Sequence, residues 1–169
     1  MNQKFSSLFK NLSYSVFANG INTLVSIILV LFVPKLLGVK EYSYWQLYLF
    51  YASYVGFFHF GWADGVYLRF GGKNYNELDK RYFNTQFWLL TFMEVAVAAI
   101  ISVVSILTIS DMNKKVILIY ISVCCVLQLP RTLLQYLLQT TNRISDYAKN
   151  YMLDRLAYAV LVIGMLLLG

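Results

Sequence analysis

The stretch NTQFWLLTFMEVAVAAIISVVSILTI, residues 84–109, decides the fold class of this chain. It holds a single charged side chain, Glu94. A helix of about 20 apolar residues, rising about 1.5 Å per residue, crosses the hydrocarbon core of a bilayer. The stretch therefore predicts a membrane-spanning helix.

The rest of the chain has the same character. Of its 169 residues 59% are hydrophobic and 13% are charged, whereas a soluble domain carries about 25% charged residues. The last apolar run, 156–169, is too short to span, so we expect it to be a fifth span that the end of the sequence interrupts. The predicted fold class is an all-α, polytopic membrane helix bundle over residues 13–169. Its expected complete spans lie near 14–37, 43–68, 84–109 and 116–138.

Residues 1–12 have a different pattern. Phe5, Leu8, Phe9 and Leu12 recur at helical spacing between polar residues, which indicates a short amphipathic helix on the membrane surface. A signal peptide is the alternative. The apolar run that follows is too long for a signal core, and no small-residue cleavage site comes after it.

The basic residues indicate topology rather than nucleic-acid binding. The formal net charge is +6, but the cations lie in short loops between apolar runs, without a basic helix or stacking platform. Assigned to alternate loops, nine fall on one side and four on the other. Cytoplasmic loops carry the excess of Lys and Arg, so we expect a cytoplasmic N-terminus and membrane lipids as partners. The smaller set is Lys35, Lys40, Lys114 and Lys115.

No catalytic or metal-binding pattern emerges. Cys124 and Cys125 are adjacent inside an apolar run, where two neighbouring thiols neither bridge easily nor form a zinc site. His59 is the only histidine. Because Ser/His/Asp and Cys/His sets are missing as well, we expect neither an enzyme nor a bound cofactor or metal.

Ionisable residues inside spans are expensive and usually face a partner or a hydrated path. Asp64, Glu94 and Arg131 are the three charged residues within the predicted spans. Asp64 is either an interfacial carboxylate paired with a loop cation such as Arg69 or part of such a path. Glu94 and Arg131 either form a structural salt bridge or line the path. His59 is either a hydrogen-bonded interior residue or a proton relay, and the amides of Asn19 and Asn22 accompany these groups.

Two further features concern the helices themselves. Gly61 and Gly65 form a G-x-x-x-G pair, which predicts close approach of another helix. Pro130, next to Arg131, is expected to kink its helix, as happens where a backbone lines a cavity.

Residues 11–75 resemble the N-terminal part of the polysaccharide-transporter flippases, in the superfamily that also contains multidrug and toxin extruders. The first apolar run ends in a P-x-x-L-G-x-x-x-Y turn, and the second ends in a G-x-x-D-G-x-x-x-R-x-x-G pattern. The matching residues are Pro34, Leu37, Gly38 and Tyr42 in the turn, and Gly61, Asp64, Gly65, Arg69 and Gly72 in the second pattern.

The resemblance implies a two-lobed flippase in the bacterial cytoplasmic membrane, with this chain as part of the first lobe and further helices completing it. Such a protein moves undecaprenyl-diphosphate-linked oligosaccharide outward for capsule or O-antigen biosynthesis, with a proton or sodium gradient as a possible energy source. A multidrug cation extruder, a non-transporting assembly subunit and an enzyme acting on polyprenyl lipids are the alternatives. The expected substrate-path residues are Arg131, Glu94, Asp64, His59, Asn19, Asn22 and Arg69.

Overall fold

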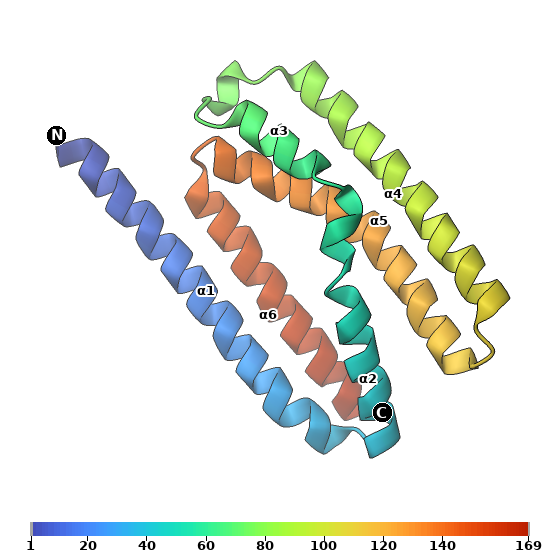
Figure 1. The fold of residues 1–169 in the computed structure, drawn as a ribbon. Coiled ribbons are helices and arrows are strands. Elements are labelled where there is room, and N and C mark those ends of the chain that lie inside the picture. Colours follow the sequence, from blue (N-terminus) through green and yellow to red (C-terminus); the bar gives the residue numbers. More distant parts are fainter. Residues whose placement is uncertain (1, 169) are drawn as a thin grey trace. The chain divides into compact units, whose positions relative to one another are not determined.

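The computed structural model describes residues 2–168, and for residues 2–8 the backbone alone (Figure 1). Every regular element in this range is helical. The α-helices are α1 (Asn2–Leu36), α2 (Val39–Ala52), α3 (Trp62–Phe70), α4 (Lys80–Thr108), α5 (Met112–Thr140) and α6 (Ile144–Leu168). Two short 3₁₀ helices, η1 (Val55–His59) and η2 (Tyr75–Glu77), flank α3.

Four helices are long and apolar enough to cross a membrane. They are Phe9–Leu36 of α1 and the whole of α4, α5 and α6. Large apolar side chains cover much of their surface: Ile100 and Leu161 are each 63% exposed. Contiguous apolar surface of this extent marks contact with lipid or with other helices. These observations confirm two expectations from the sequence: the described chain is all-helical, and it contains helices that could span a membrane.

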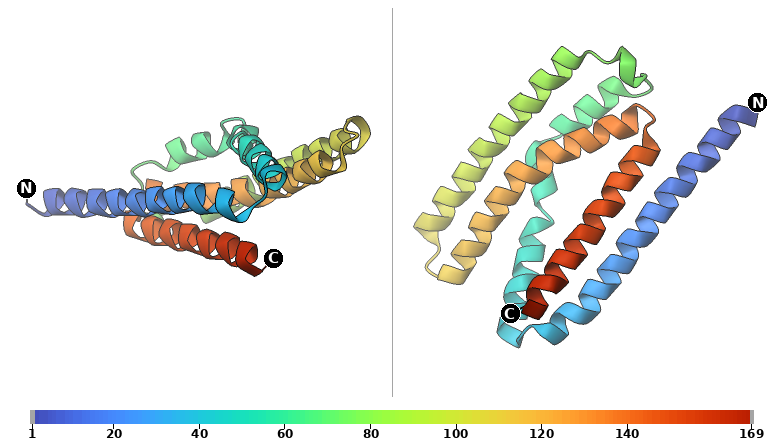
Figure 2. Two further views of the ribbon diagram at one scale, coloured as in Figure 1. Left: turned by 90° about the horizontal axis from the view of Figure 1, so that it is seen from below. Right: turned by 180° about the vertical axis from the view of Figure 1, so that it is seen from behind.

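The chain forms two compact units, of which the first contains α1 and α6. These two helices pack side by side and run in the same direction, as both views show (Figures 1 and 2). Small residues allow two helices to approach closely, and Ala18 of α1 and Ala148 and Ala159 of α6 are buried.

The second unit, residues 43–142, is built on an antiparallel hairpin of α4 and α5. Each helix begins at an aspartate that caps its free backbone N–H groups. Asp79 accepts a hydrogen bond from the backbone of Tyr82 at 3.0 Å, and Asp111 accepts one from Asn113 at 2.9 Å. Hydroxyl oxygens of Ser102 and Ser122 lie 2.8 Å apart and fix the register of the two helices. α5 bends partway along (Figures 1 and 2), and Pro130 within it lacks the backbone N–H that a straight helix needs.

The segment expected as one span near 43–68 is instead broken. α2 ends at Ala52, η1 follows, and α3 begins at Trp62. Between η1 and α3, Phe60 and Gly61 both have left-handed backbone conformations, with φ of 47° and 77°. An α-helix cannot continue through such residues. Hydropathy detects an apolar run but not a reversal of backbone dihedrals, so it merges the pieces.

Although broken, this segment extends along nearly the whole of α5. Near its start, the Tyr44 hydroxyl accepts a hydrogen bond from the Asn113 side chain at 3.1 Å. Near its end, the rings of Tyr67 and Tyr136 meet edge to face, with centroids 5.2 Å apart. Asn113 and Tyr136 are 23 residues apart (136 − 113), or about 35 Å along a helix. That distance matches a hydrocarbon core of about 30 Å.

Both ends of the chain also differ from expectation. The run 156–169 belongs to a longer helix than expected, because α6 begins at Ile144 and its 25 residues are enough to span. The charged residues Lys149 and Arg155 lie within α6, ahead of the apolar run from which the helix was predicted. The predicted surface helix 1–12 is continuous with the rest of α1. Its amphipathic face includes Phe5 and Leu8, whose side chains lie outside the described residues, so its position at the membrane surface stays a prediction.

Candidate functional site

Glu94 is the most unusual residue in the second unit. It is the middle residue of α4, 14 positions from each end (94 − 80 and 108 − 94), and its side chain is completely buried. Neither carboxyl oxygen has a hydrogen-bond partner among the described residues. Buried carboxylates almost always have partners, so this group marks a site.

The surroundings of Glu94 are apolar. Leu90 and Ala98, one turn away on each side along α4, are buried with it. Across the hairpin, Leu133 belongs to the same apolar cluster as Leu90, and Leu129 belongs to a second cluster nearer the α4–α5 turn. Glu94 therefore lies on α4 between two apolar clusters.

Arg131 is not the partner of Glu94. Leu129 and Leu133, two positions before and after Arg131, are buried, whereas Arg131 is exposed. Residues two apart on a helix point about 200° apart, so Arg131 lies on the opposite face of α5 from the two leucines. The salt bridge considered from the sequence is absent, since neither Glu94 oxygen has a partner.

His59 and Asp64 meet at the break between η1 and α3. The Nδ1 atom of His59 accepts a hydrogen bond from the backbone N–H of Gly61 at 3.0 Å and lies 3.9 Å from a carboxyl oxygen of Asp64. Because Nδ1 accepts this hydrogen bond, it is not a donor to the Asp64 carboxyl in this arrangement. His59 therefore supports the break through a backbone hydrogen bond.

Asp64 and Arg69 do not pair with each other. Asp64 lies in the first turn of α3, where a carboxylate interacts favourably with the positive end of the helix dipole, and its side chain is 57% exposed. The guanidinium of Arg69 lies over the ring of Tyr82, 4.1 Å from the centroid, in a cation–π contact. Among the sequence-predicted residues, the described structure brings His59 and Asp64 into contact.

The two glycines of the G-x-x-x-G pattern do not form a contact surface for another described helix. Gly61 precedes α3 with a positive φ, so the two residues are not on one helix face. A Cβ atom added at Gly61 or at Gly65 would meet no described atom within 4 Å. Gly61 is required for its backbone conformation rather than for close packing.

Asn19 and Asn22 lie on α1, in the first unit. Their backbone carbonyls accept hydrogen bonds from the hydroxyls of Thr23 and Ser26, each at 2.9 Å. The hydroxyls are thus satisfied within the helix. Asn19 is exposed and Asn22 is half-buried, which leaves the amide of Asn19 accessible on a candidate spanning helix.

An apolar groove of about 660 Å³ adjoins the broken segment. Five of its eight lining residues are aromatic and come from α2, η1 and the link between them; the others come from α4 and α5. The lining residues are Phe50, Tyr51, Tyr54, Phe57, Phe58, Ile101, Leu118 and Ile121. No ionisable group other than the two tyrosines lines it, so it suits an apolar chain or ring.

The chain matches no protein-family model, no curated protein and no solved structure.

Among residues 2–168, no group of three or more His, Cys, Asp or Glu side chains is arranged to hold a metal ion. Cys125 is buried, and the Sγ of Cys124 lies 3.4 Å from the hydroxyl of Tyr48. Both thiols are therefore in contact with neighbouring helices or side chains.

Sequence reasoning missed Arg155. It lies in α6, about 16 Å from the helix start at Ile144. Its Nε is buried without a hydrogen-bond partner, and its guanidinium lies 5.4 Å from the centroid of the Tyr151 ring. The sequence feature that could have located it is the mixture of acidic and basic residues within 144–155, which occurs at the start of a helix as well as in a loop.

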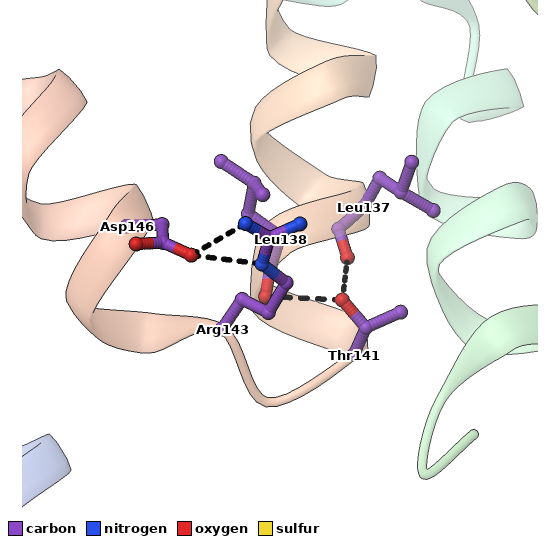
Figure 3. A network of polar contacts seen from close by, with 5 residues as sticks. All are labelled: Leu137, Leu138, Thr141, Arg143 and Asp146. Carbon is purple, nitrogen blue, oxygen red and sulfur yellow. Dashed lines mark hydrogen bonds and ion pairs between the residues drawn. The ribbon is translucent and has the colours of Figure 1, made fainter. Parts of the chain in front are cut away.

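The first turn of α6 contains the described ion pair of Arg143 with Asp146, at 2.7 Å (Figure 3). At the end of α5, the hydroxyl of Thr141 donates to the carbonyl of Leu137, also at 2.7 Å. An exposed pair of this kind contributes at most about 1 kcal/mol. It orders the start of α6 and is not a candidate site.

Proposed function

We propose that this chain is part of a membrane transporter that moves a charged solute through a polar path in the bilayer. The observation that carries the proposal is Glu94, a fully buried ionisable side chain without a partner at the middle of a candidate spanning helix. In helices too apolar for a soluble protein, such residues usually belong to ion or substrate pathways.

A fifth crossing by residues 43–70 is part of this proposal. α1 and α6 run parallel, so both cross in the same direction (Figure 2). After α1 crosses, an odd number of crossings must precede α6. α4 and α5 supply two, so the broken segment provides the third. Its extent along α5 supports the same inference. Interrupted helices are common where transporters bind their substrates.

For the substrate we propose an undecaprenyl-diphosphate-linked oligosaccharide, moved outward across the bacterial cytoplasmic membrane. The support is the resemblance of residues 11–75 to polysaccharide-transporter flippases. In this reading Arg131 contacts the diphosphate, because a guanidinium binds phosphate oxygens through two parallel hydrogen bonds. The other path residues are Asp64, His59, Arg69, Asn19 and Asn22. Further helices of the same transporter complete the path.

The test is export in a bacterial strain whose own flippase has been deleted. The full reading frame carrying Arg131→Ala should abolish capsule or O-antigen display at normal membrane abundance. Arg131→Lys keeps the charge but loses the two-pronged geometry, so we expect partial export. Lys114→Ala, at the exposed start of the same helix, is the matched control and should export normally. Normal export by Arg131→Ala at normal abundance would remove Arg131 from the path.

The aromatic groove favours one alternative, a multidrug extruder, because aromatic faces bind organic cations. The same cells distinguish the two functions. An extruder should raise resistance to organic cations without restoring surface polysaccharide, and Tyr54→Ala in the groove should reduce that resistance. A non-transporting assembly subunit should produce neither effect.

A further inference from the structure

We propose that the Glu94 carboxyl is a proton-binding site that loads and releases a proton when α4 and α5 separate. The inference rests on the proposed transport function, to which it adds the identity of the bound ion and the residue that binds it.

The register of the hairpin sets the level of the site. Ser102 of α4 faces Ser122 of α5. Because the helices are antiparallel, the residue eight positions before Ser102 lies at the level of the residue eight positions after Ser122. These residues are Glu94 and Pro130. The buried carboxyl therefore lies level with the one residue of α5 that lacks a backbone N–H.

The neighbours of the carboxyl offer nothing that neutralises a negative charge. Leu90 and Ala98 flank it on α4, and its oxygens accept no hydrogen bond from any described residue. An isolated carboxylate in such surroundings is strongly disfavoured. A positive counter-charge must therefore accompany Glu94 whenever the site is closed, and the protein residues do not supply it.

A proton satisfies this requirement better than a metal cation. Metal cations need several oxygen ligands, and no group of three or more His, Cys, Asp or Glu side chains is arranged for that in residues 2–168. A proton needs only the carboxyl itself.

Of the titratable groups on α5, Cys125 is buried, and the others are Lys114, Lys115, Tyr120, Cys124, Arg131 and Tyr136. Arg131 lies on the face opposite to the buried leucines. η1 carries His59, and α3 carries Asp64, Tyr67 and Arg69. Because none of them hydrogen-bonds to Glu94, proton binding depends mainly on whether water reaches the carboxyl.

Pro130 provides a physical route for that access. A helix missing one hydrogen bond bends most easily at that point, and α5 is bent (Figure 1). A change in the bend would separate α5 from α4 at the level of Glu94. Water could then enter and exchange the proton, and closure would trap the neutral acid again.

Infrared difference spectroscopy tests the proposal on the full-length protein reconstituted in lipid vesicles. Wild type should show the stretching band of a protonated carboxyl at neutral pH, shifted by deuterium exchange. Glu94→Gln should lose this band. Asp146→Asn, which removes an exposed carboxyl from the start of α6, is the matched control and should keep it. Thermal denaturation of both variants in parallel verifies that they are folded.

Three outcomes would overturn the inference. A band that persists unchanged in Glu94→Gln would show that another group carries the proton. A band that disappears on addition of sodium chloride, but not of potassium chloride at the same concentration, would identify a sodium site instead. The measurement requires no transported substrate, so its failure differs from failure of the export test: absence of the band removes the proton site, whereas normal export by Arg131→Ala removes the proposed substrate contact.

Discussion

The side chain of Glu77 closes the short turn that leads into α4. Its carboxyl accepts hydrogen bonds from the side-chain amide of Asn74 at 2.8 Å and from the backbone N–H of Asn74 at 3.3 Å. These bonds favour the charged form, and the Asn74 side chain makes the larger contribution to a lowered pKa of Glu77. The turn lies outside the four candidate spanning helices.

This contact predicts a pH dependence of the turn. Because the pKa of Glu77 is lower in the folded chain, the contact contributes its full stability above the unfolded pKa of about 4.3. That stability is lost as the pH falls through the folded value. In Asn74→Ala the pKa of Glu77 should rise partway towards its ordinary value, because the backbone hydrogen bond remains. An NMR titration of carbon-13-labelled glutamate measures this, with Asn84→Ala as the control. An unchanged Glu77 pKa in Asn74→Ala would contradict the account.

From the sequence, individual site residues were predictable only by their position along a predicted helix. Glu94 is evident in the sequence because a charge within residues 84–109 is conspicuous. Its lack of a partner is not evident, since the sequence gives distances along a helix but not the packing of one helix face on another. For the same reason the sequence leaves open whether Asp64 pairs with a loop cation such as Arg69; in the structure Asp64 lies near His59, and Arg69 stacks on Tyr82.

The break between η1 and α3 predicts opposite effects for two glycines four positions apart. Gly61 has a φ of 77°, which residues with a Cβ adopt at a cost of about 1–2 kcal/mol. Gly65 lies within α3, and its Cβ position is open. Gly61→Ala should therefore lower the free energy of unfolding by about 1–2 kcal/mol. Gly65→Ala should raise it by up to about 1 kcal/mol through helix propensity.

Thermal unfolding of the detergent-solubilised protein distinguishes these effects from the close-contact interpretation. If the two glycines serve helix packing, both alanine variants should be destabilised. Equal destabilisation of Gly61→Ala and Gly65→Ala would restore that interpretation and contradict the conformational role of Gly61.

The elements were predictable where composition alone determines them. The helices over residues 84–109 and 116–138 were expected within a few residues of α4 and α5, because long apolar runs without glycine or proline clusters have few alternatives. The start of α6 was missed because Lys149 and Arg155 look like loop residues. The break at residues 53–61 was missed because Gly56 and Gly61 are tolerated inside apolar helices as well as at their ends.

For the whole chain, the central claim is an odd number of crossings between α1 and α6. The parallel packing of these two helices (Figure 1) and the extent of residues 43–70 along α5 both support it. If the broken segment did not cross, α1 and α6 would traverse the bilayer in opposite directions. The claim also determines whether the break lies within the bilayer, where its polar backbone groups would line a path.

Cysteine labelling on the two sides of the broken segment tests this claim most directly. Lys40 and Lys73 are exposed and lie before and after it. In a variant with Cys124 and Cys125 replaced by alanine, Lys40→Cys should react with an impermeant thiol reagent on intact cells. Lys73→Cys should react only after the membrane is permeabilised. Lys114→Cys and Arg143→Cys should behave like the sites at 40 and 73, respectively. Reaction of the 40 and 73 sites from the same side of the membrane would contradict the broken crossing and the path proposed along it.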